Sequence, residues 1–204
     1  MNQIEMVNLA LTALGASRIS NIDDDTREES RVMKTLYMPT VEEVLTLFPW
    51  PSSTTRARLA QISDGADLTK WAYAYQLPAD VCYVVSMLDA DDYSEYELSK
   101  SIDRASPLST PFFEREGTKI YTDSDECVIK YVKFPAEPDG LRDILGEAIG
   151  MRLAQKACLR LNADASLSQK LEMDFERALL RAKAADSIDR RSDSIEVKTW
   201  GDYR

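Results

Sequence analysis

Residues 26–60, TREESRVMKTLYMPTVEEVLTLFPWPSSTTRARLA, are the stretch from which the fold of this chain can be worked out. Within the stretch, apolar residues recur at every third or fourth position, namely Met33, Tyr37, Val41, Val44 and Phe48. This spacing places them on one face of a long α-helix, and other elements must cover that face. We expect Asp25 or Thr26 to cap the N-terminus of the helix with a side-chain oxygen.

Prolines divide the stretch. Pro39 lies inside the helical pattern and lacks a backbone N–H, so we expect it to kink the helix. Alternatively, the second half restarts after the proline, because Thr40 and Glu43 have the spacing of a capping box. The sequence PWP at 49–51 then ends the helix, and its tryptophan needs a buried site.

Three further segments have the periodicity of amphipathic helices. Residues 2–14 carry an apolar face and are followed by Gly15, which suits a left-handed C-cap. Residues 141–161 combine large apolar residues with alanines that permit close helix packing. A helix capped by Ser166 follows and continues to about residue 185. Because the turn at 162–165 is short, these last two helices should be antiparallel neighbours.

Between the helical segments the sequence predicts β-structure. Aromatic residues alternate with small ones over 71–80, and residues 81–87 are a nearly continuous apolar run, as in a buried strand. Turn residues at 116–117 and 123–125 predict two consecutive tight hairpins within 112–131. The expected fold class is therefore mainly α with a small antiparallel β insertion, an α+β protein.

These elements predict three parts. A bundle of about four helices is formed by residues 1–62 and 136–186. An antiparallel β subdomain at 63–135 is inserted into it, and an extended C-terminal tail occupies 187–204.

The composition excludes several classes of chemistry. The 204-residue chain is 44% hydrophobic, enough for a core, and it contains no histidine. Without histidine, Ser-His-Asp and Cys-His catalysis and histidine-ligated zinc are excluded. Three widely spaced cysteines, Cys82, Cys127 and Cys158, predict reduced, buried thiols in a cytosolic protein. No apolar run is long enough for a membrane-spanning helix.

The negative charge of the chain is unevenly placed. The formal net charge is −10, and residues 62–140 carry 16 acidic and 7 basic side chains. An acidic surface repels a phosphate backbone, so a nucleic-acid reader is not expected, although DNA could slide past such a surface without binding. The triplet of aspartates at 23–25 looks like a calcium loop but lacks the EF-hand glycine and glutamate, so we interpret it as helix-capping surface. We expect no metal and no cofactor.

Acidic side chains cluster again at 89–103, among them Asp91, Asp92 and Glu95. Two such carboxylates roughly 5 to 9 Å apart across a cleft could hydrolyse a glycan, with Trp71 as a stacking platform for the sugar. A solvated acidic loop is the simpler interpretation. A carboxylate-dependent glycan hydrolase is therefore the alternative function.

Residues 187–204 follow the last helix after its apolar stripe ends. Several side chains in this segment are candidates for docking on a partner, namely Arg190, Arg191, Ile195, Trp200 and Tyr203. The aromatic residues could fill pockets, and the arginines could pair with acidic groups of the partner. An arm packed on its own subunit and plain disorder are the alternatives.

Taken together, the pattern resembles the head-to-tail adaptor family of tailed phages, called tail tubular protein A in short-tailed phages. The matching segments are NLAL at 8–11, LGA at 14–16, Ile19 with DDD at 23–25, Tyr37, VL at 44–45, PW at 49–50, residues 57–60 and YQLPAD at 75–80. The acidic entry into the helix at 141–161 and the alanine-rich pair of closing helices also match. The resemblance covers most of the chain and is weakest over 89–135. The family often has an aromatic residue shortly after the tryptophan, whereas this chain has PSS at 51–53.

The resemblance implies a structural virion protein without enzymatic activity, located at the head–tail junction and, during assembly, in the host cytoplasm. It implies a ring of twelve copies that joins the portal protein ring to the tail nozzle protein. Genomic DNA would pass through this ring as cargo, and the C-terminal tail would reach the portal. Neither a cofactor nor a membrane is implied. A glycan hydrolase of the phage tail is the alternative.

Overall fold

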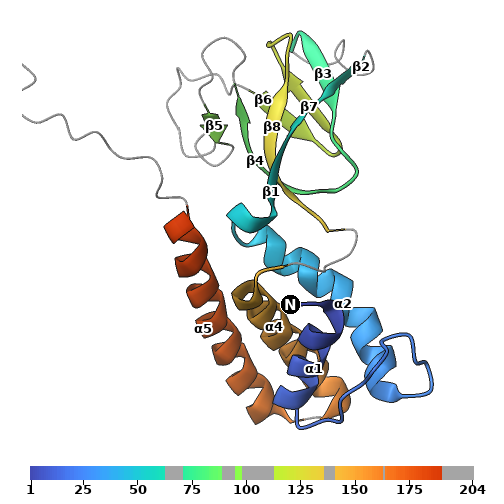
Figure 1. The fold of residues 1–204 in the computed structure, drawn as a ribbon. Helices are drawn as coiled ribbons and strands as arrows, with labels where there is room; N and C mark the ends of the chain where they lie inside the picture. The colour runs from blue at the N-terminus through green and yellow to red at the C-terminus, as the bar shows by residue number, and fades with distance from the viewer. Residues whose placement is uncertain (63–70, 89–94, 98–112, 136–140, 163, 190–204) are drawn as a thin grey trace, which may run out of the picture.

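Helices and strands occupy opposite ends of the molecule in the computed structural model (Figure 1). The structure describes residues 1–62, 71–88, 95–97, 113–135, 141–162 and 164–189. The helices of this described part are α1 (Gln3–Ala13), α2 (Glu28–Thr46), α4 (Asp143–Leu161) and α5 (Ala165–Asp189), with a short 3-10 helix, η1 (Pro51–Ser53), after α2. Together with the strands, they make the α+β fold that the sequence predicted.

Helix α1 begins and ends as its sequence predicts. Asn2 and Glu5 form a capping box at its N-terminus, with each side chain accepting from the other residue's backbone N–H at 2.8 Å. At its C-terminal end Gly15 has a φ of 71°, a conformation that residues with a Cβ rarely adopt. The chain can therefore reverse direction immediately after α1 and run back toward the start of α2.

Helix α2 carries the predicted apolar face, because Met33, Tyr37, Val41 and Val44 are buried. Its predicted N-cap is wrong. The N-cap residue is Arg27, and no side chain caps the helix there. The Oδ1 atom of Asp24 accepts from the backbone N–H and the hydroxyl of Thr26, so these two residues form a turn before the helix.

Pro39 does not divide α2 into two helices. The helix is continuous from Glu28 to Thr46, and Pro39 is on its exposed side. The capping box expected at Thr40 and Glu43 is absent, because the hydroxyl of Thr40 donates to the backbone oxygen of Leu36 inside the helix. The Glu43 side chain turns instead toward α4, as described below.

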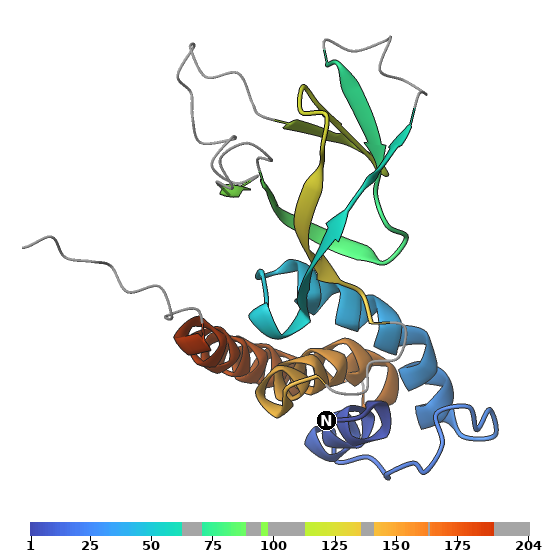
Figure 2. The ribbon, with the colours of Figure 1, turned by 45° about the horizontal axis from the view of Figure 1, so that its top comes forward.

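Helices α4 and α5 form the predicted antiparallel pair (Figures 1 and 2). Residues at the start of α4 contact residues near the end of α5, as in an antiparallel pair. Arg142 contacts Asp186, Glu147 contacts Arg181, and Arg152 contacts Phe175. The predicted cap at Ser166 is wrong by two residues. Asp164 is the capping residue, because its Oδ1 atom accepts from the backbone N–H of Ser166 at 2.8 Å and of Leu167 at 3.2 Å.

Two four-stranded antiparallel sheets make the β part. One has the order β1-β8-β4-β5 and the other β2-β3-β7-β6. The strands are β1 (Thr54–Arg58), β2 (Ala60–Ile62), β3 (Tyr73–Gln76), β4 (Val81–Leu88), β5 (Glu95–Glu97), β6 (Phe113–Glu116), β7 (Lys119–Thr122) and β8 (Val128–Lys133). The sheets share a set of buried residues that includes Leu59, Tyr75, Val84 and Ile129, so a second core lies between them.

The strand pairing corrects two predictions. The hairpin of β6 and β7 is present, but β8 pairs with β1 and β4 and not with β7. The turn at 123–125 therefore carries the chain from one sheet to the other. The predicted boundary of the β subdomain at 63 is also wrong, because β1 and β2 already belong to the two sheets. Local turn and strand signals cannot reveal such long-range partners.

The core of the helical part extends into the β part. Trp50 is fully buried, its indole N–H donates to the backbone oxygen of Val44 at 3.0 Å, and Val85 and Val132 from β4 and β8 join the same cluster. Of the three free cysteines, Cys127 and Cys158 are buried as expected, and Cys82 is only partly buried. Among the described residues no helix is long and apolar enough to cross a membrane.

Candidate interaction surfaces

The tail residues chosen from the sequence, Arg190, Arg191, Ile195, Trp200 and Tyr203, lie outside the described residues. The structure does fix the point from which they start. Helix α5 continues to Asp189, so residues 187–189 belong to the helix and not to the tail as predicted. The end of α5 lies beside η1, at the junction of the helical and β parts (Figure 1).

Asp186 anchors this end of α5. Its side chain is 4% exposed, and it accepts hydrogen bonds from Arg142 at 3.0 Å and from the hydroxyl of Ser52 at 3.3 Å. A buried carboxylate is stable only when its charge and lone pairs are satisfied, which these two donors do. Asp186 therefore joins α5 to the start of α4 and to η1 before the tail begins.

The groups proposed for glycan hydrolysis are not assembled by the described structure. Asp91 and Asp92 lie outside the described residues, as does the side chain of Glu95, whose backbone forms part of β5. The predicted role of Trp71 as a stacking platform for a sugar is wrong. It is only 5% exposed, packs with Ala74 and Tyr121, and donates its indole N–H to Glu114 at 2.9 Å. Its ring face is covered by the protein.

The aspartates at 23–25 have protein partners. Lys34 of α2 lies 3.1 Å from Asp23 and 3.6 Å from Asp25, and Asp24 holds the turn at Thr26. The hydrogen bonds from Thr26 lower the pKa of Asp24. In the part of the chain that the structure describes, no group of three or more Cys, Asp or Glu side chains is placed to hold a metal ion.

A cluster of charges connects α2 to α4. Glu43 of α2 accepts from Arg152 of α4, with 2.9 Å to Nε and 2.5 Å to Nη2, and it also pairs with Lys156. The guanidinium of Arg152 lies over the Phe175 ring of α5, 5.1 Å from its centroid. Burial by itself raises the pKa of Glu43, but hydrogen bonds from Lys156 and Arg152 outweigh burial, so the pKa is lowered. The cluster holds three helices together.

The basic residues of α4 form a row along one side of the helix. Arg152, Lys156 and Arg160 are spaced four residues apart and therefore lie on one side of the helix. The first two are paired with Glu43, while Arg160, at the end of the row, forms no ion pair within the described residues. At this end α4 faces the first half of α2.

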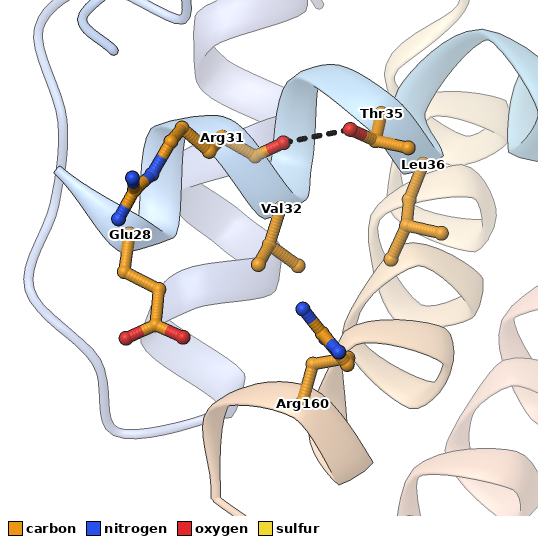
Figure 3. Close-up of a pocket in the computed structure, with 6 residues that line it drawn as sticks. All are labelled: Glu28, Arg31, Val32, Thr35, Leu36 and Arg160. Atoms are coloured by element: carbon orange, nitrogen blue, oxygen red, sulfur yellow. Dashed lines mark hydrogen bonds between the residues drawn. The ribbon is translucent and has the colours of Figure 1, made fainter. Parts of the chain in front are cut away.

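An open groove lies there between α2 and α4. It has a volume of about 570 Å³ and is lined by Glu28, Arg31, Val32, Thr35, Leu36 and Arg160. Figure 3 shows the guanidinium of Arg160 pointing from α4 toward Val32 on α2. The half-buried Val32 and Leu36 pack against the helical core and supply apolar surface, and Arg31 and Arg160 are exposed beside them.

One feature of this groove, its basic side, could have been predicted from the sequence. The spacing of Arg152, Lys156 and Arg160 predicts a basic row on one helix face. Its position opposite α2 could not be predicted, because Glu43 is 109 residues from Arg152 along the chain. Comparison of the sequence with protein-family models and with curated proteins finds no match.

Proposed function

We propose that this protein is a structural head-to-tail adaptor of a tailed phage, whose copies form a ring between the portal protein and the tail nozzle protein. The proposal rests on the resemblance of its sequence pattern to that family. It describes a virion protein without enzymatic activity. Genomic DNA passes through the ring and is not a ligand.

The proposal is supported most directly by the structural roles of the residues that match the family. Asn8 binds the loop after α1, Gly15 provides the left-handed turn, and Trp50 fills the junction between the helical and β parts. Asp80 accepts from the hydroxyl of Tyr131 at 3.2 Å and thereby ties the start of β4 to β8. These positions set the arrangement of elements, so a shared pattern at them supports a shared architecture.

The charge distribution also supports an adaptor. The excess of acidic side chains lies in residues 62–140, and phosphates would be repelled by such a surface. A channel for DNA works best when DNA does not bind to its wall, because bound phosphates would slow passage.

Electron microscopy of the purified protein mixed with the portal ring of the same phage tests the proposal. We expect an additional ring of twelve subunits on the tail-facing side of the portal. The portal ring of an unrelated phage is the control and should remain bare. A matched portal that stays bare at high protein concentration would contradict the adaptor function.

A further inference from the structure

The outer face of α5 carries an uncovered apolar ridge. Met173 is 48% exposed and Leu180 is 67% exposed, and they are seven residues apart, two helical turns along the same face. The buried face of α5 is formed by Leu171, Phe175, Ala178 and Ala182. Leu171 and Met173, like Ala178 and Leu180, are two residues apart, which is roughly 200° around the helix. The ridge therefore points away from α4.

Two carboxylates accompany this ridge. Glu172 and Glu176 are exposed and form no ion pair among the described residues, whereas the neighbouring Arg177 and Arg181 are paired with Asp174 and Glu147. The two glutamates are four residues apart, where like charges repel one another and destabilise a helix. A partner that brings positive charge would relieve this repulsion.

The groove between α2 and α4 has the opposite properties. It is concave, its apolar surface comes from Val32 and Leu36, and the guanidinium groups of Arg31 and Arg160 form no ion pair within the described part of the chain. Glu28 adds a single negative charge to the lining, so positive charge prevails. An apolar ridge flanked by carboxylates matches an apolar groove flanked by guanidinium groups, and these charges are unpaired among the described residues.

We propose that the α5 ridge of one copy docks into the α2–α4 groove of a second copy. One copy cannot make this contact with itself, because its ridge points away from α4 and Arg160 of the groove is on α4. The contact uses a different patch on each copy, so a row of bound copies leaves one groove open at one end and one ridge open at the other. Such a head-to-tail contact produces a closed ring or an open filament. The inference deepens the proposed adaptor function, since it names the lateral contact of the ring.

Site-directed crosslinking tests this contact. In the full chain with Cys82→Ser, Thr35→Cys places a thiol in the groove and Leu180→Cys places one on the ridge. We expect a short bismaleimide to join a mixture of the two single variants into heterodimers, and to join the double variant into a ladder of multimers. Neither single variant should crosslink to itself. Thr118→Cys, at the turn between β6 and β7, replaces Thr35→Cys in the matched control and should give no ladder.

Charge reversal provides a second readout. Glu176→Lys should lower the yield of the Thr35–Leu180 crosslink about tenfold, because it places a cation against Arg31 and Arg160. Arg160→Glu in the partner copy should restore the yield. Absence of the ladder, or self-crosslinking of Leu180→Cys alone, would overturn the proposal, as would a yield unaffected by charge reversal.

The outcomes for contact and function are separable. Twelve-subunit rings on the portal without a Thr35–Leu180 crosslink would refute the ridge-to-groove contact and leave the adaptor function in place. A crosslinked ladder from a protein that never binds the portal would support the contact and refute the adaptor function.

Discussion

At the scale of single residues, Asn8 shows how one side chain holds a loop. Its Oδ1 atom accepts from the backbone N–H of Ile19, and its Nδ2 donates to the backbone oxygen of the same residue, both at 2.9 Å. Ile19 is 4% exposed. Loss of both hydrogen bonds would leave two backbone groups of Ile19 unsatisfied in a part-buried site.

Asn8→Ala should therefore lower the free energy of unfolding by about 2 kcal/mol, since each unsatisfied buried group costs on the order of 1–3 kcal/mol. Chemical denaturation of the variant and the parent measures the difference. Asn21→Ala is the matched control in the same loop, because its side chain accepts a single exposed hydrogen bond, from Asp23. If both variants lose the same free energy of unfolding, the two hydrogen bonds from Asn8 to Ile19 have no special role.

Glu43 gives the protein a specific dependence on pH. Its pKa in the fold is below the ordinary value of 4.5, because hydrogen bonds from Lys156 and Arg152 outweigh the effect of burial. Its stabilising contribution is fully present above pH 4.5 and is lost as the pH falls through the lowered folded pKa. We expect Glu43→Gln to be less stable than the parent by about 1–2 kcal/mol at pH 7.

This difference should shrink as the pH falls below 4.5, because the parent then loses the same charge. Denaturant titrations of both proteins between pH 7 and pH 3 measure it. When the stability of the variant is subtracted from that of the parent at each pH, the contributions of the other acidic groups cancel. A difference that stays constant over this range would mean that Glu43 is not the titrating group.

At the scale of elements, two glycines of α4 lie against the N-terminal segment of the chain, and Gly150 permits α4 to approach α1 closely. A Cβ on Gly150 would lie 2.9 Å from a methyl carbon of Leu9 and 3.2 Å from the backbone oxygen of Met6. The backbone oxygen can move only if α1 moves. At Gly146 the nearest atoms, at 2.9 Å, are side-chain atoms of Met1, the first residue of the chain.

Gly150→Ala should lower the free energy of unfolding by about 1–3 kcal/mol, the usual cost of overpacking a core. Gly146→Ala is the matched control, and we expect it to be nearly neutral. There the displaced side chain can move, and alanine gains about 0.5–1 kcal/mol in helix propensity. Thermal unfolding of both variants compares them. If Gly146→Ala is as destabilising as Gly150→Ala, the backbone of α1 is not what limits the approach.

At the scale of the whole molecule, the anchoring of α5 separates the fold from the tail. Asp186, which holds α5 to α4 and η1, precedes residue 190, as do the buried residues of α5. Deletion of residues 190–204 should therefore leave the melting temperature nearly unchanged. By our proposal the same deletion should abolish assembly on the portal, because Trp200, Tyr203 and the two arginines are lost.

Calorimetry and electron microscopy of the truncated protein test the two statements separately. Asp186→Ala is the contrasting variant, since it removes a buried partner of Arg142 and should lower the melting temperature. A truncated protein that unfolds much earlier would show that the tail belongs to the fold. A truncated protein that still forms rings on the portal would show that the tail is not needed for docking.

The sequence by itself determined the elements whose signals are local. The apolar face of α2, the extent of α1 with Gly15 after it, the α4–α5 pair and the β6–β7 hairpin were all predicted. In each case the deciding residues lie within a few turns of helix or one hairpin of each other. Periodicity and turn chemistry act over this range, so they can be read without knowing the rest of the fold.

The tertiary structure alone decided which elements far apart in the sequence meet. It paired β8 with β1 and β4, assigned β1 and β2 to the sheets, buried Trp71 and directed Glu43 to α4. It also created the groove, whose lining residues come from positions 28–36 and 160. These contacts depend on shape and burial between segments that are far apart in the chain. The partners of a strand are decided only when the competing strands are brought together in space. The same holds for Glu43, whose side chain could cap a helix or pair with another helix.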